Sequence, residues 1–139
     1  MAKNNLNQWS LTLLRVVLGV IFAYHGYLKL FAPDGFSGTV TFFTMIKIPF
    51  PLYSALLVSV VEFVGGIFLI LGMVTKISSL LLLVNMLVAF FTVHLKNGFL
   101  VSKGGYEFAL VLIAALVVVL VNGAGKLSVG KLFKSKILE

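Results

Sequence analysis

The sequence predicts an all-α membrane protein, folded as a four-helix transmembrane bundle. Sixty per cent of the 139 residues are apolar and only 11% are charged, whereas a soluble domain has roughly a quarter of its residues charged. The apolar residues gather in four stretches that approach the roughly 20 residues a helix needs to cross a bilayer. None of these stretches alternates strictly, as a membrane strand would. One domain therefore covers residues 1–139, with spans expected at 11–31, 52–71, 77–95 and 107–122.

Charge and cysteine content exclude several classes of function. No cysteine is present, which removes disulfides, thiolate nucleophiles and thiolate metal sites. The net charge is +7, and the lysines lie beside the apolar stretches, so we expect membrane lipids and no nucleic acid as partners. The positive-inside rule places both termini in the cytoplasm, with the basic tail 124–139 on anionic lipid. The lysines on the cytoplasmic side are Lys3, Lys76, Lys126, Lys131, Lys134 and Lys136, and those on the outer side are Lys47, Lys96 and Lys103.

The first span carries three ionisable side chains, which are costly inside a membrane and therefore candidates for function. Arg15, His25 and Lys29 fall on one helical stripe, so this stripe should face the bundle interior. Because helical side chains lean toward their own N-terminus, His25 and Lys29 should lean into the membrane, whereas Arg15 should snorkel to the inner interface. The same charges, and the lack of a small-residue cleavage site, argue against a secretory signal.

The segment 32–51 is expected to be an apolar external loop between the first two spans. It opens on the turn signal Pro33-Asp34-Gly35, and Pro49 and Pro51 favour an extended backbone before the second span. Its aromatic residues, Phe42 and Phe43 among them, are too apolar for a free loop, so the segment should lie in the outer interface or fold over the bundle. A lid over a binding site and a simple cap on the helix ends are the two alternatives.

Glu62 is the charged residue of the second span. It shares a stripe with small residues at positions 55, 59, 65 and 66, which allow close helix approach. The second span runs opposite to the first, so the Glu62 side chain should converge with His25 and Lys29 in the outer leaflet. This trio is the predicted catalytic site. The alternative is a structural ion pair that locks the helix packing.

The third span offers two polar residues that ideal geometry keeps apart. Asn85 is expected to join helices by hydrogen bonding, and His94 to lie near the outer end. The two side chains point about 180° apart on an ideal helix, so they share a cavity only if the helix ends or distorts between them. Two histidines without a third nitrogen or a thiolate do not predict a metal site.

The fourth span begins with Glu107, whose carboxylate complements the helix dipole in the first turn. Glu107 could also pair with Lys29 or Lys96 at the outer face. Tyr24 lies at the level of the expected aromatic belt, where a tyrosine needs no ligand to explain it. Both residues are kept as candidate ligand contacts.

The order of motifs along the chain resembles the DoxX family of small bacterial membrane proteins. The motifs are Arg15 and Gly19 in the first span, then HGYLKLF, an FF pair before IPFP, VEFVGGIFLILG, HLKNGF and GGYEFAL. The resemblance covers about 13–127 and implies a four-helix bundle in the bacterial cytoplasmic (inner) membrane. It also implies redox physiology, since family members resemble a subunit of a thiosulfate:quinone oxidoreductase or are linked to resistance to quinones, catechols or thiol stress. The polar positions shared with the family fall on Arg15, His25, Lys29, Glu62, His94, Asn97 and Glu107.

Together these features favour a quinone-linked redox subunit or quinone-binding protein. The resemblance implies a quinone as the lipophilic small molecule. No motif encodes a cofactor, so electrons would come from a redox partner protein or a bound cofactor. A transporter or exporter of small molecules is a second hypothesis, and four helices without an inverted repeat would then need a homo-oligomer. A non-catalytic scaffold of a membrane redox complex is the third, so whether the chain is itself an enzyme stays open. The candidate catalytic residues are His25, Lys29 and Glu62, and the candidate ligand contacts are Arg15, Tyr24, Phe42, Phe43, Asn85, His94 and Glu107.

Overall fold

A computed structural model describes residues 2–132, with side chains for 5–130, and this part of the chain is helical with short connections. The π-helix η1 continues α4 directly, and two short 3₁₀ turns lead from it to α5. The elements in chain order are α1 (Ala2–Phe31), α2 (Gly35–Met45), α3 (Pro51–Leu71), α4 (Thr75–Ala89), η1 (Phe90–His94), η2 (Leu95–Asn97), η3 (Val101–Lys103), α5 (Glu107–Asn122) and α6 (Val129–Leu132).

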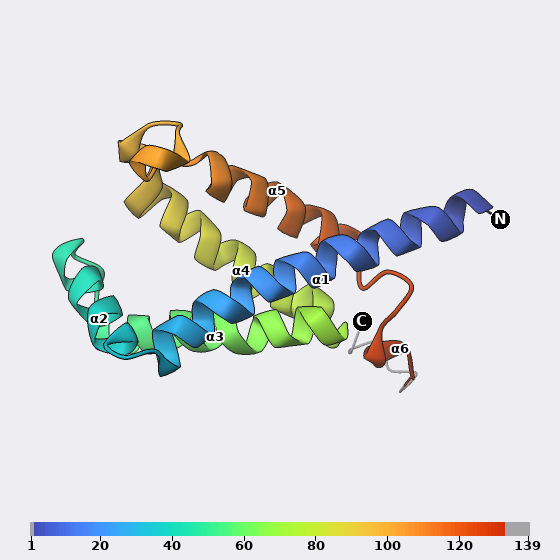
Figure 1. Ribbon diagram of the computed structural model, residues 1–139, viewed down its shortest axis with the longest axis horizontal. Coiled ribbons are helices and arrows are strands. Elements are labelled where there is room, and N and C mark those ends of the chain that lie inside the picture. Colours follow the sequence, from blue (N-terminus) through green and yellow to red (C-terminus); the bar gives the residue numbers. More distant parts are fainter. Residues whose placement is uncertain (1, 133–139) are drawn as a thin grey trace.

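The four long helices run up and down in sequence, as Figure 1 shows. The molecule has a terminal end, where α1 begins, α3 meets α4, and α5 finishes, and an opposite end that carries α2 and the turns between η1 and α5. α1 packs mainly against α3, and α4 packs mainly against α5. The fold is therefore the four-helix bundle that the sequence predicts.

Small residues bring α1 and α3 into close contact. A side-chain carbon on Gly26 would collide with the backbone of Phe63, and one on Gly66 would collide with the backbone of Ala23. A carbon added to Gly19 would lie 2.7 Å from the carbonyl oxygen of Gly66. These distances are too short for any residue with a side-chain carbon. The glycines therefore set the distance between the two helices.

The apolar core occupies the middle and terminal end of the bundle. Leu18 and Phe22 of α1 meet Leu69 of α3 there. The remaining buried members come from α4 and α5 and are Leu82, Met86, Ala109, Leu112, Leu116 and Val119. Away from this core the α1/α3 pair and the α4/α5 pair diverge toward α2 (Figure 1). The bundle is thus closed at one end and open at the other.

Arg15 is buried at the terminal end, with 1% of its surface exposed. Its guanidinium donates to the carbonyls of Leu69 and Ile70, in the last turn of α3, and to the carbonyl of Leu127 at 2.6 Å. A cation at a helix C-terminus satisfies carbonyls that have no partner within the helix and complements the dipole. The prediction that Arg15 snorkels to the interface is therefore wrong, because protein carbonyls replace water around it.

The segment after α5 closes the same end. Thr12 Oγ1 accepts hydrogen bonds from the backbone N–H groups of Lys126 and Leu127, at 2.9 and 3.3 Å. Ser128 Oγ donates to the carbonyl of Gly72, where α3 ends. The beginning of the predicted tail 124–139 is thus held against α1 and α3. Its residues 133–139, with Lys134 and Lys136, lie outside the described residues.

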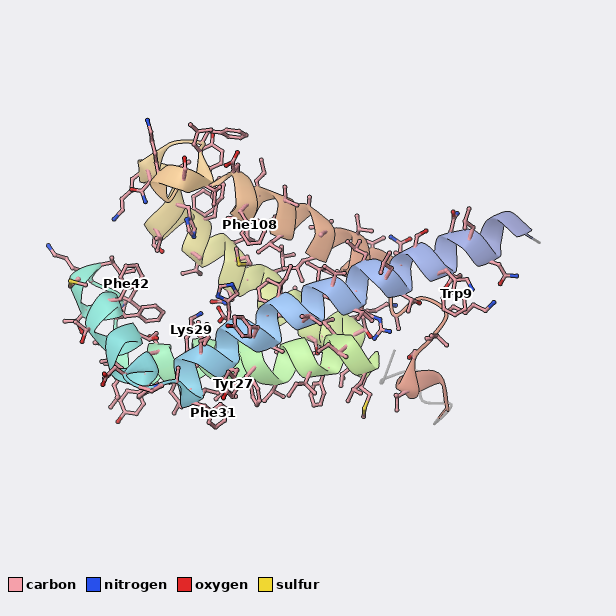
Figure 2. The ribbon with its side chains drawn as sticks, viewed as in Figure 1. Trp9, Tyr27, Lys29, Phe31, Phe42 and Phe108 are labelled. Carbon is pink, nitrogen blue, oxygen red and sulfur yellow. The ribbon has the colours of Figure 1, made fainter. Side chains whose placement is uncertain are left out.

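Three helices are long and apolar enough to cross a membrane, over Asn5–Phe31, Pro51–Leu71 and Thr75–Asn97 in the described part of the chain. α5, a shorter apolar helix of 16 residues, extends about 24 Å at 1.5 Å per residue. Large apolar side chains stand out from the bundle, as Trp9 and Phe31 of α1 show in Figure 2. Exposed examples on the four long helices are Leu13, Leu56, Leu80 and Val121. Outward apolar faces are what a bilayer requires of a membrane bundle.

Three local predictions need correction. The segment predicted as an external loop contains the helix α2, and Phe50 before Pro51 is left-handed, with φ 48°, where an extended backbone was expected. The chain has to reverse between α2 and α3, and this conformation achieves the reversal. The helix α1 begins at Ala2 and contains the whole predicted span 11–31. The third span changes from α-helix to π-helix at Phe90, before its predicted end.

Candidate functional site

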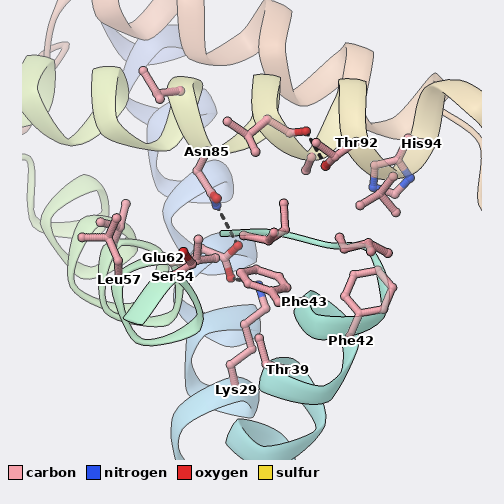
Figure 3. A pocket seen from close by; sticks show the side chains of 18 of the residues that line it. Lys29, Thr39, Phe42, Phe43, Ser54, Leu57, Glu62, Asn85, Thr92 and His94 are labelled. Carbon is pink, nitrogen blue, oxygen red and sulfur yellow. Dashed lines mark hydrogen bonds and ion pairs between the residues drawn. The ribbon is translucent and has the colours of Figure 1, made fainter. Parts of the chain in front are cut away.

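A cavity of about 800 Å³ lies where the two helix pairs diverge (Figure 3). α2 and α3 form one wall, α4 and η1 form the other, and α1 contributes Lys29. The lining is mainly apolar. Its apolar members include Phe42, Phe43, Ile46, Leu57, Val58, Val61, Leu81, Val84, Val88 and Val93, and its polar members are Lys29, Thr39, Ser54, Glu62, Asn85, Thr92 and His94.

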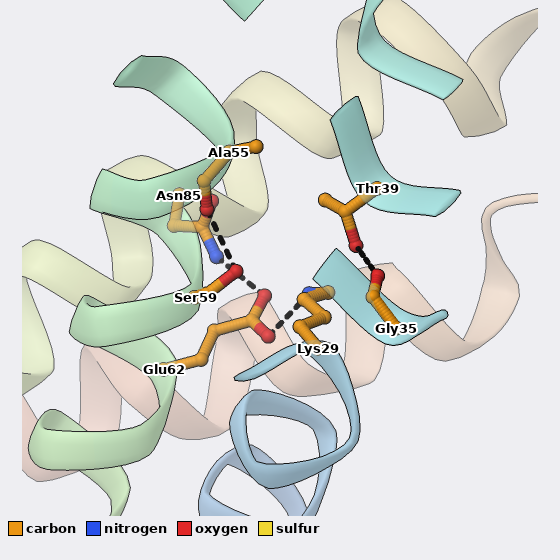
Figure 4. Close-up of polar contacts among 7 residues, drawn as sticks. All are labelled: Lys29, Gly35, Thr39, Ala55, Ser59, Glu62 and Asn85. Atoms are coloured by element: carbon orange, nitrogen blue, oxygen red, sulfur yellow. Dashed lines mark hydrogen bonds and ion pairs between the residues drawn. The ribbon is translucent and has the colours of Figure 1, made fainter. Parts of the chain in front are cut away.

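Three polar side chains from three helices meet at one end of this cavity (Figure 4), where its two walls come together. Lys29 of α1 forms an ion pair with Glu62 Oε2 of α3. Asn85 Nδ2 of α4 donates to Glu62 Oε1 at 2.9 Å. Both oxygens of the Glu62 carboxylate are therefore engaged. The hydrogen bond from Asn85 to Glu62 joins the α4/α5 pair to the α1/α3 pair.

The cluster forms because the stripe around Glu62 is small and buried. Ala55, Ser59 and Gly66 are buried on the same face of α3, and only 6% of the Glu62 surface is exposed. The Ser59 hydroxyl donates to the carbonyl of Ala55, so it leaves the carboxylate to Lys29 and Asn85. A buried carboxylate is tolerated when it is paired and hydrogen-bonded, and both conditions are met here.

The π-helix brings His94 into the same cavity as Asn85. Each residue of a π-helix turns the chain less than an α-helical residue does, so the five residues of η1 shift the helical phase between the two positions. Both Asn85 and His94 consequently line the cavity. His94 Nδ1 lies 2.9 Å from the carbonyl oxygen of Gly104, which fixes the ring.

α2 covers the cavity with one face. Thr39, Phe42, Phe43 and Ile46 follow the spacing i, i+3, i+4 and i+7, and all four line the cavity. The Phe42 and Phe43 rings lie 6.2 Å apart (centroid to centroid), and Thr39 Oγ1 donates to the carbonyl of Gly35. Thr39 was missed because this segment was treated as a loop, although its helical spacing was present in the sequence.

Four sequence-predicted residues lie away from the cavity. His25 is exposed, and its ring lies edge-on to Tyr24, which is also exposed. The expected convergence of His25 with Glu62 is therefore absent, whereas that of Lys29 is present. Arg15 holds the terminal end of α3, and Glu107 accepts the backbone N–H of Val101 at 2.6 Å in place of a lysine.

Comparison with known proteins identifies the family of this chain. The DoxX family model matches residues 10–95. The chain is a member of the DoxX family. A protein of Bacillus subtilis named "Putative oxidoreductase CatD" is 32% identical over 125 residues, which cover 89% of this chain and 87% of that protein. A Haemophilus influenzae protein, named only as uncharacterized, is 34% identical over 73 residues, or 52% of this chain and 48% of its own length. No solved structure matches this DoxX chain.

The family and the apolar helices establish a membrane protein related to a protein named as an oxidoreductase. Within the described residues of this DoxX protein, no group of three or more His, Asp or Glu side chains could hold a metal ion. The chemistry that its cavity offers is an apolar surface for a lipophilic ligand and hydrogen-bonding groups at defined positions. Ligand pockets in proteins commonly combine such an apolar lining with a few placed polar groups.

Proposed function

We propose that this DoxX protein binds a quinone in the cavity between α2, α3 and α4, as a quinone-linked component of a redox system in the bacterial inner membrane. The observation that carries this proposal is an apolar cavity with the Lys29–Glu62–Asn85 cluster in its wall. A quinone has the matching structure, since its ring and tail are apolar and its carbonyl oxygens accept hydrogen bonds.

The size and donor set of the cavity fit such a ligand. Ligand pockets usually range from about 300 to 1,000 Å³, and this cavity measures about 800 Å³. Lys29 donates one N–H to Glu62, and an ammonium group has three N–H donors. Lys29 therefore retains donors for a quinone carbonyl while it stays paired with the carboxylate.

Reduction of a quinone to a hydroquinone consumes two electrons and two protons. Glu62 and Lys29 are the proton-exchanging groups beside the proposed ring position, and transfer to a reacting oxygen requires such a group within hydrogen-bond reach. The sequence contains no cysteine, so the electrons come from a redox partner protein or a bound cofactor. The relative named as an oxidoreductase supports this assignment.

Filling the cavity tests the proposal. Val88 of α4 lines the cavity, whereas Val111 of α5 is an exposed valine outside it. Binding of a short-chain ubiquinone analogue is measured by calorimetry on protein in nanodiscs. Val88→Trp should weaken binding at least about tenfold, since the indole occupies the ring position, and Val111→Trp should leave it unchanged. Equal affinities in all three proteins, or no binding by the wild type, would refute the proposal.

A further inference from the structure

The hydrogen bond to the Gly104 carbonyl determines which ring nitrogen of His94 carries the proton. A carbonyl oxygen only accepts hydrogen bonds, so the 2.9 Å contact with Gly104 requires a proton on His94 Nδ1. Asn97 Nδ2 donates to the same carbonyl at 3.2 Å, which uses its second lone pair. In the neutral imidazole, Nε2 is then the free acceptor of a side chain that lines the cavity.

The two ends of the cavity therefore differ in hydrogen-bonding character. At one end both Glu62 oxygens already accept a hydrogen bond, from Lys29 and from Asn85, so Lys29 supplies the unused donors, and an ammonium group cannot accept. At the other, His94 supplies an acceptor. Asn85, which bonds to Glu62 beside Lys29, and His94 are nine positions apart along one continuous helical segment, and Figure 3 shows them well apart along the cavity wall. Their separation along the helix axis is at most about 14 Å at 1.5 Å per residue. A single aromatic ring is shorter than this, so we assign one ring position to each end.

We infer that the cavity contains two positions for the ligand head group, which distinguish its oxidised and reduced forms. The position beside Lys29 takes the quinone, whose oxygens only accept hydrogen bonds. The position beside His94 takes the hydroquinone, whose hydroxyl donates to Nε2. This inference rests on the proposed function, and it adds that His94 determines specificity for the reduced ligand. Phe42 and Val93 line the same cavity and supply apolar contacts for a ring.

Two substitutions separate this role from a structural one. The amide nitrogen of asparagine can replace Nδ1 and keep the bond to Gly104, so His94→Asn removes the acceptor at the Nε2 position. Glutamine reaches further, so His94→Gln places an amide oxygen near the Nε2 position as a replacement acceptor. His94→Asn thus removes the ligand contact and keeps the bond to Gly104, whereas His94→Gln keeps an acceptor for the ligand and gives up the bond to Gly104.

The experiment measures dissociation constants of a short-chain ubiquinone analogue and of its reduced form in nanodiscs. His94→Asn should weaken hydroquinone binding by about 2- to 12-fold, the range for one hydrogen bond, and weaken quinone binding by a smaller factor. His94→Gln should restore most of the lost affinity. Lys29→Met should show the reverse preference, with the larger loss for the quinone.

The outcomes separate this inference from the proposed function. Equal losses for both ligand forms in His94→Asn, or no loss for the hydroquinone, would overturn the two-position inference and leave quinone binding standing. A wild-type protein that binds neither form would overturn the proposed function and this inference together.

Discussion

The ion pair between Lys29 and Glu62 should contribute measurably to the free energy of unfolding. Breaking a buried pair by removing one partner costs about 3–5 kcal/mol. The Glu62 side chain is 8% exposed, but that of Lys29 is 27% exposed and reaches the cavity. Water there lowers the cost toward the about 1.5–3 kcal/mol of a hydrogen bond to a charged group. We expect Lys29→Met to lower the free energy of unfolding by about 2–3 kcal/mol.

The double substitution should recover most of this loss. Glu62→Gln keeps an oxygen for Asn85 but leaves Lys29 without its counter-ion, so it should cost about 1–2 kcal/mol. When Lys29→Met and Glu62→Gln are combined, no unpaired charge is left. The double variant should therefore lie within about 1 kcal/mol of the wild type, with a coupling energy of about 2–5 kcal/mol.

Unfolding in mixed micelles of rising SDS content gives these energies. Trp9 is the sole tryptophan of the chain and lies under the Lys126 ammonium, 5.4 Å from the ring centroid to Nζ. Its fluorescence reports unfolding without an added label. Lys76→Met, at an exposed lysine near the start of α4, is the control and should change stability by less than about 0.5 kcal/mol. If the two single losses simply add in the double variant, the pair carries no coupling and the reasoning is wrong.

Two further predictions concern the helix contacts that hold the site. Gly26→Val should lower stability by about 1–3 kcal/mol, as overpacking does, because the new side chain meets the backbone of Phe63. Gly38→Ala is its control, since nothing lies within 4 Å of the added carbon; equal effects of the two in the SDS titration would contradict the close contact. Thr12→Val should cost about 1–2 kcal/mol, since it removes the acceptor of two backbone N–H groups after α5. A Thr12→Val protein with unchanged stability and unchanged Trp9 emission would show that this segment does not hold the terminal end.

The fold was predictable from the sequence because membrane helices are set by length and hydropathy. The prediction for α5 matches its observed bounds, Glu107–Asn122, and α3 begins one residue before its predicted start. The N-terminal extension of α1 was missed, since its first turns are polar and carry no apolar stretch. α2 was missed for another reason. The Pro33-Asp34-Gly35 turn before it and the prolines after it suggested a loop, although Thr39, Phe42, Phe43 and Ile46 carry helical spacing.

The site was predictable only in part. Helical phase and side-chain direction correctly brought Lys29 to Glu62, because both helices are regular over that distance. The same reasoning placed His25 beside them, yet His25 is exposed. His94 depended on a π-helix that no residue pattern announces, so ideal geometry put it on the wrong face. Arg15 was treated as an interfacial charge because the chain that supplies the carbonyl of Leu127 is distant in sequence.

Photoaffinity labelling shows directly whether a quinone binds in the cavity. An azido-quinone is activated in membrane vesicles that contain the protein, and the labelled peptides are mapped by mass spectrometry. If the quinone binds in the cavity, labels are expected on cavity residues such as Phe42, Val58 and Val88, and excess unlabelled quinone should suppress them. Labels confined to exposed residues outside the cavity, such as Leu13 and Val121, and insensitive to competitor would contradict quinone binding in the cavity.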